Sequence, residues 1–129
     1  MSMKKKSIAL SILVLLTVFF VGTSLMRAGY FTRWDGKTRM SDVTREDTIT
    51  LSGKGEIVGL SVLITGHIDG TAIVKQSYEG KDMYTYEIGP GKVHLYTGGD
   101  WYGNECIIKY KPRDVKSGTL EIKYQFRRL

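Results

Sequence analysis

The stretch LEIKYQF, residues 120–126, alternates apolar and polar side chains at every position. Side chains in an extended strand repeat every two residues, so the four apolar residues would all lie on one face. They are Leu120, Ile122, Tyr124 and Phe126. One apolar and one polar face are typical of an antiparallel strand that packs on a core and faces water on its other side. The stretch therefore predicts a β-protein whose last strand lies on the core.

Six runs of residues upstream show the same preference for strands, and Gly, Pro and Asp residues separate them. They are residues 48–52, 57–68, 71–78, 83–88, 92–97 and 104–111. No apolar spacing typical of a helix follows Met26. Strands at intervals of roughly 8 to 12 residues predict a single antiparallel β-sandwich of about seven strands, with a small β-barrel as the alternative.

The turn signals predict how these strands are connected. Asp69-Gly70 separates two apolar runs, which is a strong signal for a tight hairpin, so we expect 57–68 and 71–78 to be neighbours in one sheet. Further loops are expected at Gly89-Pro90-Gly91 and at Gly98-Gly99-Asp100. The expected inward residues of the longest run are Val58, Leu60, Val62, Ile64 and Ile68.

Residues 7–26, SIALSILVLLTVFFVGTSLM, contain no charged residue and follow Lys4, Lys5 and Lys6. A helix of about 20 residues is about 30 Å long, which matches the hydrocarbon core of a bilayer. Small residues from Gly22 to Ser24 also suit a cleavage site. Residues 1–26 are therefore interpreted as a signal peptide or a signal-anchor helix, and both alternatives stay open. In either case we expect the rest of the chain to be extracytoplasmic, either secreted or held at the membrane by residues 7–26.

Between this segment and the first expected strand, residues 27–47 are mostly polar and mixed in charge. They show neither the two-residue period of a strand nor the period of a helix. We interpret them as a linker or irregular lead-in, which places the folded β-sandwich domain at residues 48–129.

The formal net charge of +6 includes the three N-terminal lysines. Without them, 16 Lys and Arg residues stand against 13 Asp and Glu residues, and the two signs are interspersed along the chain. This distribution shows no basic stripe suited to a phosphate backbone, so we expect no nucleic-acid partner. Cys106 is the only cysteine, which excludes an intramolecular disulfide and leaves stability to packing.

A cluster of aromatic and polar residues around Gly98 and Gly99 is the best candidate for a ligand site. Its members are Tyr96, Asp100, Trp101 and Tyr102. Aromatic faces stack on ligands at low conformational cost and a carboxylate adds hydrogen bonds, so the cluster suits a protein or carbohydrate ligand. The alternative is that Trp101 closes one end of the sandwich as a core residue.

The sequence offers little for catalysis. It contains no G-x-S-x-G nucleophile elbow, no metal-ligand spacing and no cofactor motif, so we expect neither a metal site nor a cofactor. We therefore interpret the chain as a noncatalytic extracytoplasmic interaction or structural module. The alternative is an extracytoplasmic hydrolase or metal-dependent enzyme with a site built from loops, for which His94, Asp100 and Glu105 are the candidates.

Overall fold

The computed structural model describes residues 33–129, so the signal or anchor segment expected at residues 1–26 lies outside the described residues. Within the described part of the chain, no helix has the length and apolar character needed to cross a membrane. The described residues form eight strands. They are β1 (Gly36–Arg39), β2 (Asp47–Ser52), β3 (Ile57–Ile68), β4 (Ala72–Tyr78), β5 (Lys81–Ile88), β6 (Gly91–Asp100), β7 (Glu105–Pro112) and β8 (Gly118–Arg128).

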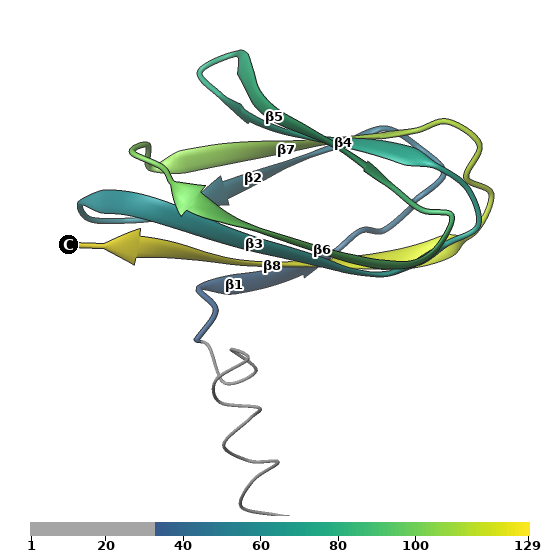
Figure 1. Ribbon diagram of the computed structural model, residues 1–129, viewed down its shortest axis with the longest axis horizontal. Helices are drawn as coiled ribbons and strands as arrows, with labels where there is room; N and C mark the ends of the chain where they lie inside the picture. Colours follow the sequence, from purple (N-terminus) through teal and green to yellow (C-terminus); the bar gives the residue numbers. More distant parts are fainter. Residues whose placement is uncertain (1–32) are drawn as a thin grey trace, which may run out of the picture. The chain divides into compact units, whose positions relative to one another are not determined.

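The strands form two antiparallel sheets of four, stacked as two layers (Figure 1). The first sheet has the order β1-β8-β3-β6 and the second has the order β2-β7-β4-β5. Two sheets of four strands in which every connection except β4–β5 crosses between the layers form a jelly roll, one kind of β-sandwich. The predicted all-β sandwich is therefore confirmed, with one strand more than expected.

The prediction of a hairpin at Asp69-Gly70 is wrong, because β3 belongs to the first sheet and β4 to the second. Strand β3 pairs with β8 on one side and with β6 on the other, so neither of its edges is free to accept β4. The Asp69 carboxylate instead accepts hydrogen bonds from the backbone N–H groups of Lys116 (2.8 Å) and Ser117 (3.1 Å). These bonds, the Lys116 bond first, lower the pKa of Asp69. Asp69 therefore ties two sheet-crossing loops together.

Strands β4 and β5 are the only consecutive pair within residues 33–129 that are neighbours in one sheet. Their turn is Glu79-Gly80, and both residues have positive φ, 50° and 78°. This backbone matches the twist of a two-residue hairpin turn. Tyr78 and Lys81 pair directly on either side of this two-residue turn.

Residues 34–47, expected to be part of an irregular lead-in, belong to the folded unit. Gly36–Arg39 is a strand that pairs with β8, and Met40 and Val43 lie in the core with 5% and 4% of their surface exposed. The Asp35 carboxylate accepts a hydrogen bond from the Phe126 N–H at 2.8 Å. The folded unit accordingly begins at Trp34 and not at residue 48.

Two smaller expectations also fail. Gly98-Gly99-Asp100 is the end of β6 and not a loop, because these residues pair with Ser61, Leu60 and Gly59 of β3. At the start of β3 a bulge shifts the register, so that Ile57 is buried and Val58 only half-buried.

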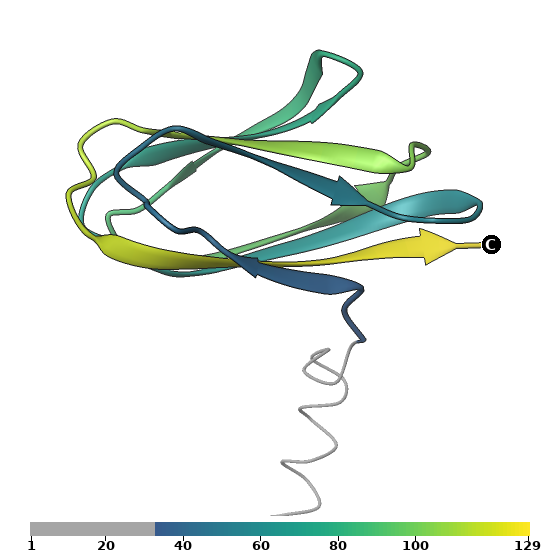
Figure 2. The ribbon, with the colours of Figure 1, turned by 180° about the vertical axis from the view of Figure 1, so that it is seen from behind.

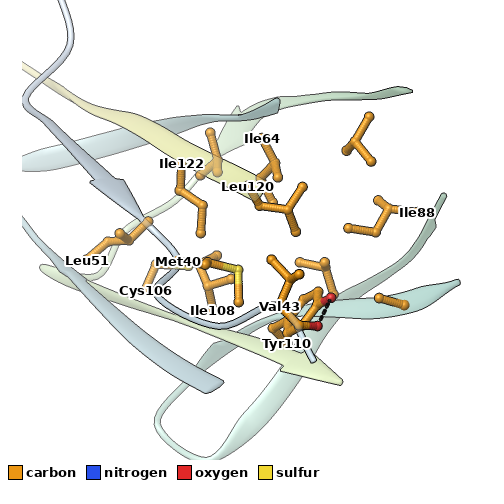
Figure 3. Packing of buried hydrophobic residues seen from close by; sticks show 14 of the residues in the cluster. Met40, Val43, Leu51, Ile64, Ile88, Cys106, Ile108, Tyr110, Leu120 and Ile122 are labelled. Atoms are coloured by element: carbon orange, nitrogen blue, oxygen red, sulfur yellow. Dashed lines mark hydrogen bonds between the residues drawn. The ribbon is translucent and has the colours of Figure 1, made fainter. Parts of the chain in front are cut away.

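The core lies between the two sheets (Figure 3). Leu120 and Ile122 of the first sheet face Cys106 and Ile108 of the second, and each is at most 1% exposed. Burial raises the pKa of the Cys106 thiol to about 12, so the thiol stays protonated and acts as a small apolar side chain. The inward face predicted from residues 120–126 is therefore confirmed.

Candidate binding site at the β5–β6 edge

Strand β5 is the last strand of the second sheet and β6 is the last strand of the first. The two-residue connection Gly89-Pro90 joins them, so both edge strands lie on the same side of the sandwich. Figure 1 shows the turn end of the β4–β5 hairpin bending away from the rest of the sandwich. Side chains at this edge are only partly covered, since Tyr84 of β5 is 49% exposed.

Two cavities of about 100 Å³ and about 210 Å³ lie at this edge. Both are lined by Tyr84, Asp100 and Trp101, and we call them together the edge groove. The smaller cavity continues between the sheets along Gln76, Tyr86 and Thr97. The larger one opens toward Met83 and Tyr102.

One wall of the edge groove consists of tyrosines on β5. Tyr84 and Tyr86 stand opposite Gln76 and Val74 of β4, which are buried, so the two rings lie on the inner face of the second sheet. No further strand follows β5 in this sheet order, and Tyr84 remains 49% exposed. Partial burial, with a smaller effect of Tyr84, raises the pKa of the Tyr86 hydroxyl. The Tyr86 hydroxyl is therefore a neutral hydrogen-bonding group at ordinary pH.

The opposite wall is β6, whose lining residues Thr97, Gly98 and Gly99 are small. The Gln76 side-chain amide, 5% exposed, donates a hydrogen bond across the two sheets to the Thr97 hydroxyl at 2.8 Å. A buried amide can make more than one hydrogen bond, so Gln76 keeps a polar surface at the groove. The bond also joins the two walls at the inner end of the groove.

Trp101 forms the floor of the edge groove and is only 6% exposed. Its indole N–H donates to the Glu105 carbonyl at 3.0 Å, and its ring meets Tyr78 edge to face with 5.9 Å between ring centroids. Gly103 makes this packing possible, because a Cβ there would lie 2.3 Å from the Tyr78 ring. The burial of Trp101 agrees with the interpretation that it closes one end of the sandwich.

The structure brings together three of the four residues singled out in the sequence. Asp100, Trp101 and Tyr102 line one cavity, and Tyr102 is 76% exposed. Tyr96 lies on the outer face of the first sheet, where its hydroxyl donates to the Ser61 hydroxyl at 3.3 Å. The β4–β5 hairpin also contributes to the groove, which the sequence pattern did not predict. The missed lining residues are Gln76, Tyr78, Met83, Tyr84 and Tyr86.

The residues proposed for the enzymatic alternative lie on different sheets. His94 is on the outer face of β6, whereas Glu105 begins β7 in the second sheet. Across residues 33–129, no three His, Cys, Asp or Glu side chains gather in a way that could hold a metal ion. The edge groove therefore offers aromatic faces, hydroxyls, one amide and one carboxylate as its binding chemistry.

The fold and the groove together define a jelly-roll β-sandwich with a candidate ligand site at one edge. No protein-family model matches the sequence. No curated protein sequence matches it either.

Solved structures similar to this chain include carbohydrate-binding modules and other proteins. The crystal structure of PirA is 15% identical with a TM-score of 0.48, over 73% of this chain and 95% of that one. A CBM4 structure is 7% identical with a TM-score of 0.42, over 74% of this chain and 76% of that one. The carbohydrate-binding module CBM36 in complex with calcium and xylotriose is 13% identical with a TM-score of 0.39, over 74% of this chain and 92% of that one.

Proposed function

We propose that this chain is a noncatalytic extracytoplasmic binding module whose edge groove takes a carbohydrate chain. The observation that carries the proposal is the half-exposed Tyr84 ring, which faces small residues of β6 over a floor closed by Trp101. A tyrosine presents a broad apolar face with few rotatable bonds, so stacking on a sugar ring costs little conformational entropy.

The composition of the groove favours a sugar over a charged ligand. Among the residues that line either of the two cavities, Asp100 is the only ionisable side chain apart from the tyrosines. The other polar side chains are hydroxyls and the Gln76 amide, which match the donors and acceptors of sugar hydroxyl groups.

Three of the five large exposed apolar side chains of residues 33–129 line the edge groove. In the described part of the chain the five are Met83, Tyr84, Tyr96, Tyr102 and the terminal Leu129. Met83, Tyr84 and Tyr102 line the groove, whereas Tyr96 lies on the outer face of β6. Apolar surface that is concentrated in one place and rimmed by polar groups is typical of an interaction site.

The extracytoplasmic location is part of the proposal and rests on the apolar segment at residues 7–26. A module outside the cytoplasm would meet polysaccharides, either as a secreted protein or held at the membrane by that segment. Protease added outside intact cells stripped of their outer layers should digest the folded unit, and protection until lysis would contradict this location.

Affinity electrophoresis through gels that contain single neutral polysaccharides tests the binding function. We expect the protein to be retarded by at least one of them, and Tyr84→Ala to weaken that retardation about tenfold, because one stacking ring can carry more than 1 kcal/mol of binding. Thr85→Ala is the matched control, since Thr85 lies opposite Lys75 on the outer face of the same strand. The proposal fails if no polysaccharide retards the protein, or if the two variants behave alike.

A further inference from the structure

The outer faces of the two sheets carry very different charge. Cross-strand partners point to the same side of a sheet, so the register identifies the residues that point away from the core. On the first sheet the outward cations are Lys37, Arg39, Lys92, Lys123 and Arg127. The outward acids of that sheet are Glu121 and Asp100, the last residue of β6, which also lines the edge groove. We call this surface the basic face.

The second sheet is balanced at the corresponding positions. Its outward cations are Lys75, Lys109 and Lys111, and its outward acids are Asp82, Glu87 and Glu105. The sequence showed only interspersed charges, because residues of one sheet face come from strands far apart in the chain. The fold sorts these charges and leaves a surplus of positive charge on one side.

The ion pairs increase this contrast. On the second sheet, Lys75 and Lys109 both contact the Asp82 carboxylate, at 3.4 Å and 3.2 Å. On the basic face, Lys123 is the one cation that forms an ion pair within residues 33–129, with Glu121 at 3.7 Å. Lys37 lies directly opposite Lys123. Like charges in that arrangement destabilise a sheet, and an anion bound between them would remove the repulsion.

Tyr96 lies on the basic face and is 59% exposed. A Cβ on Gly98 would lie 3.3 Å from the Tyr96 ring, so the ring leans along the strand over this glycine. The Tyr96 hydroxyl reaches Ser61 on the neighbouring strand. The ring is thus held along the sheet surface by a hydrogen bond, and its free face is turned to solvent.

We propose that the basic face binds an acidic polysaccharide, with Tyr96 stacked on a sugar ring and the unpaired cations contacting carboxylate or sulfate groups. Arg127 is already held in place, because its guanidinium donates to the Gly99 carbonyl at 2.7 Å. This site lies on the opposite side of β6 from the inward residues of the edge groove and does not depend on carbohydrate binding there.

Two features favour a polysaccharide over other anionic partners. The Tyr96 ring lies along the sheet and does not project outward as a membrane-inserting ring would. The five cations are spread over a four-stranded sheet, about 15 Å across, and share it with two carboxylates. Such spacing suits a polymer with separated charges better than the closely spaced phosphates of a nucleic acid.

The test measures binding of the purified full-length protein to polygalacturonate, with its methyl-esterified form as the uncharged probe of the same chain. We expect binding to the acidic form only, weakened by added salt because the contacts are exposed. The double variant Lys37→Gln with Arg39→Gln and the single variant Tyr96→Ala should each lower the affinity about tenfold. The control is the double variant Lys75→Gln with Lys111→Gln, which removes the same charge from the other sheet. We expect this variant to bind polygalacturonate as tightly as the unchanged protein does.

Several results would overturn the proposal. They are an absence of binding to polygalacturonate, equal losses in the two charge variants, and full binding by Tyr96→Ala. Tighter binding to anionic phospholipid vesicles or to duplex DNA at the same salt concentration would assign the basic face to those partners instead. Tyr84→Ala should leave polygalacturonate binding unchanged, which separates this site from the edge groove. Thermal unfolding of each variant confirms that it is folded.

Discussion

The two edges of the sandwich differ in how far their side chains are covered. At the β1–β2 edge, the connection between the sheets buries Met40 and Val43, and the Tyr110 hydroxyl donates to the Val43 carbonyl at 2.7 Å (Figure 3). At the β5–β6 edge, Tyr84 stays half-exposed over a groove. The same two-sheet core is therefore sealed on one side and accessible on the other.

The lengths of the two connections explain the difference. Residues 40–46 link β1 to β2 and cross from one sheet to the other, as Figure 2 shows, so their apolar side chains can reach the core. Only Gly89 and Pro90 link β5 to β6. A connection that short has no side chains to cover the rest of its edge. An open edge therefore needs its own amphipathic residues, here tyrosines, to contact both core and water.

The largest expected effect concerns the floor of the open edge. Trp101→Ala should lower the free energy of unfolding by about 3 to 5 kcal/mol, because it removes a buried ring and leaves a cavity beneath the groove. A urea melt measures this loss. A loss below about 1 kcal/mol would mean that Trp101 is a surface ring, and the contrast between a closed floor and an accessible wall would no longer hold.

The second prediction compares the two edges directly. Met40→Ala should cost about 2 to 5 kcal/mol, since Met40 is 5% exposed in the sealed edge. Tyr84→Ala should cost less than about 1 kcal/mol, because nearly half of that side chain already faces solvent. The two variants can be melted side by side in urea. Equal losses would show that both edges are sealed to the same degree.

Local pattern was enough to predict the strands that carry a full apolar face, such as residues 120–126. It missed Gly36–Arg39, because GKTR has no apolar residue and this strand is held by pairing with β8. Local pattern also predicted a hairpin at Asp69-Gly70 that does not form. Strand β4 cannot pair with β3 because β6 and β8, which come from distant parts of the chain, occupy both edges of β3.

The same limit applies to the candidate site. Asp100, Trp101 and Tyr102 are consecutive in the chain, so their grouping is visible in the sequence. Tyr84 and Tyr110 are both tyrosines within strands, yet Tyr110 is 2% exposed and Tyr84 is 49% exposed. Only the position of β5 at the end of its sheet distinguishes a groove tyrosine from a core tyrosine.

The smallest expected effect is a pH dependence in the hairpin that carries the open edge. A hydrogen bond from the Ser77 hydroxyl, then one from Lys109, lowers the pKa of Asp82 to about 2. A carboxyl group with a lowered folded-state pKa stabilises the fold above its unfolded pKa of about 3.9, and this contribution is lost as the pH falls toward 2. Asp82→Asn should therefore unfold at a lower urea concentration than the unchanged protein at pH 6, and the difference should shrink between pH 4 and pH 2. A difference that stays constant over that range would show that Asp82 does not anchor the hairpin through its charge, and that the open edge owes its position to packing alone.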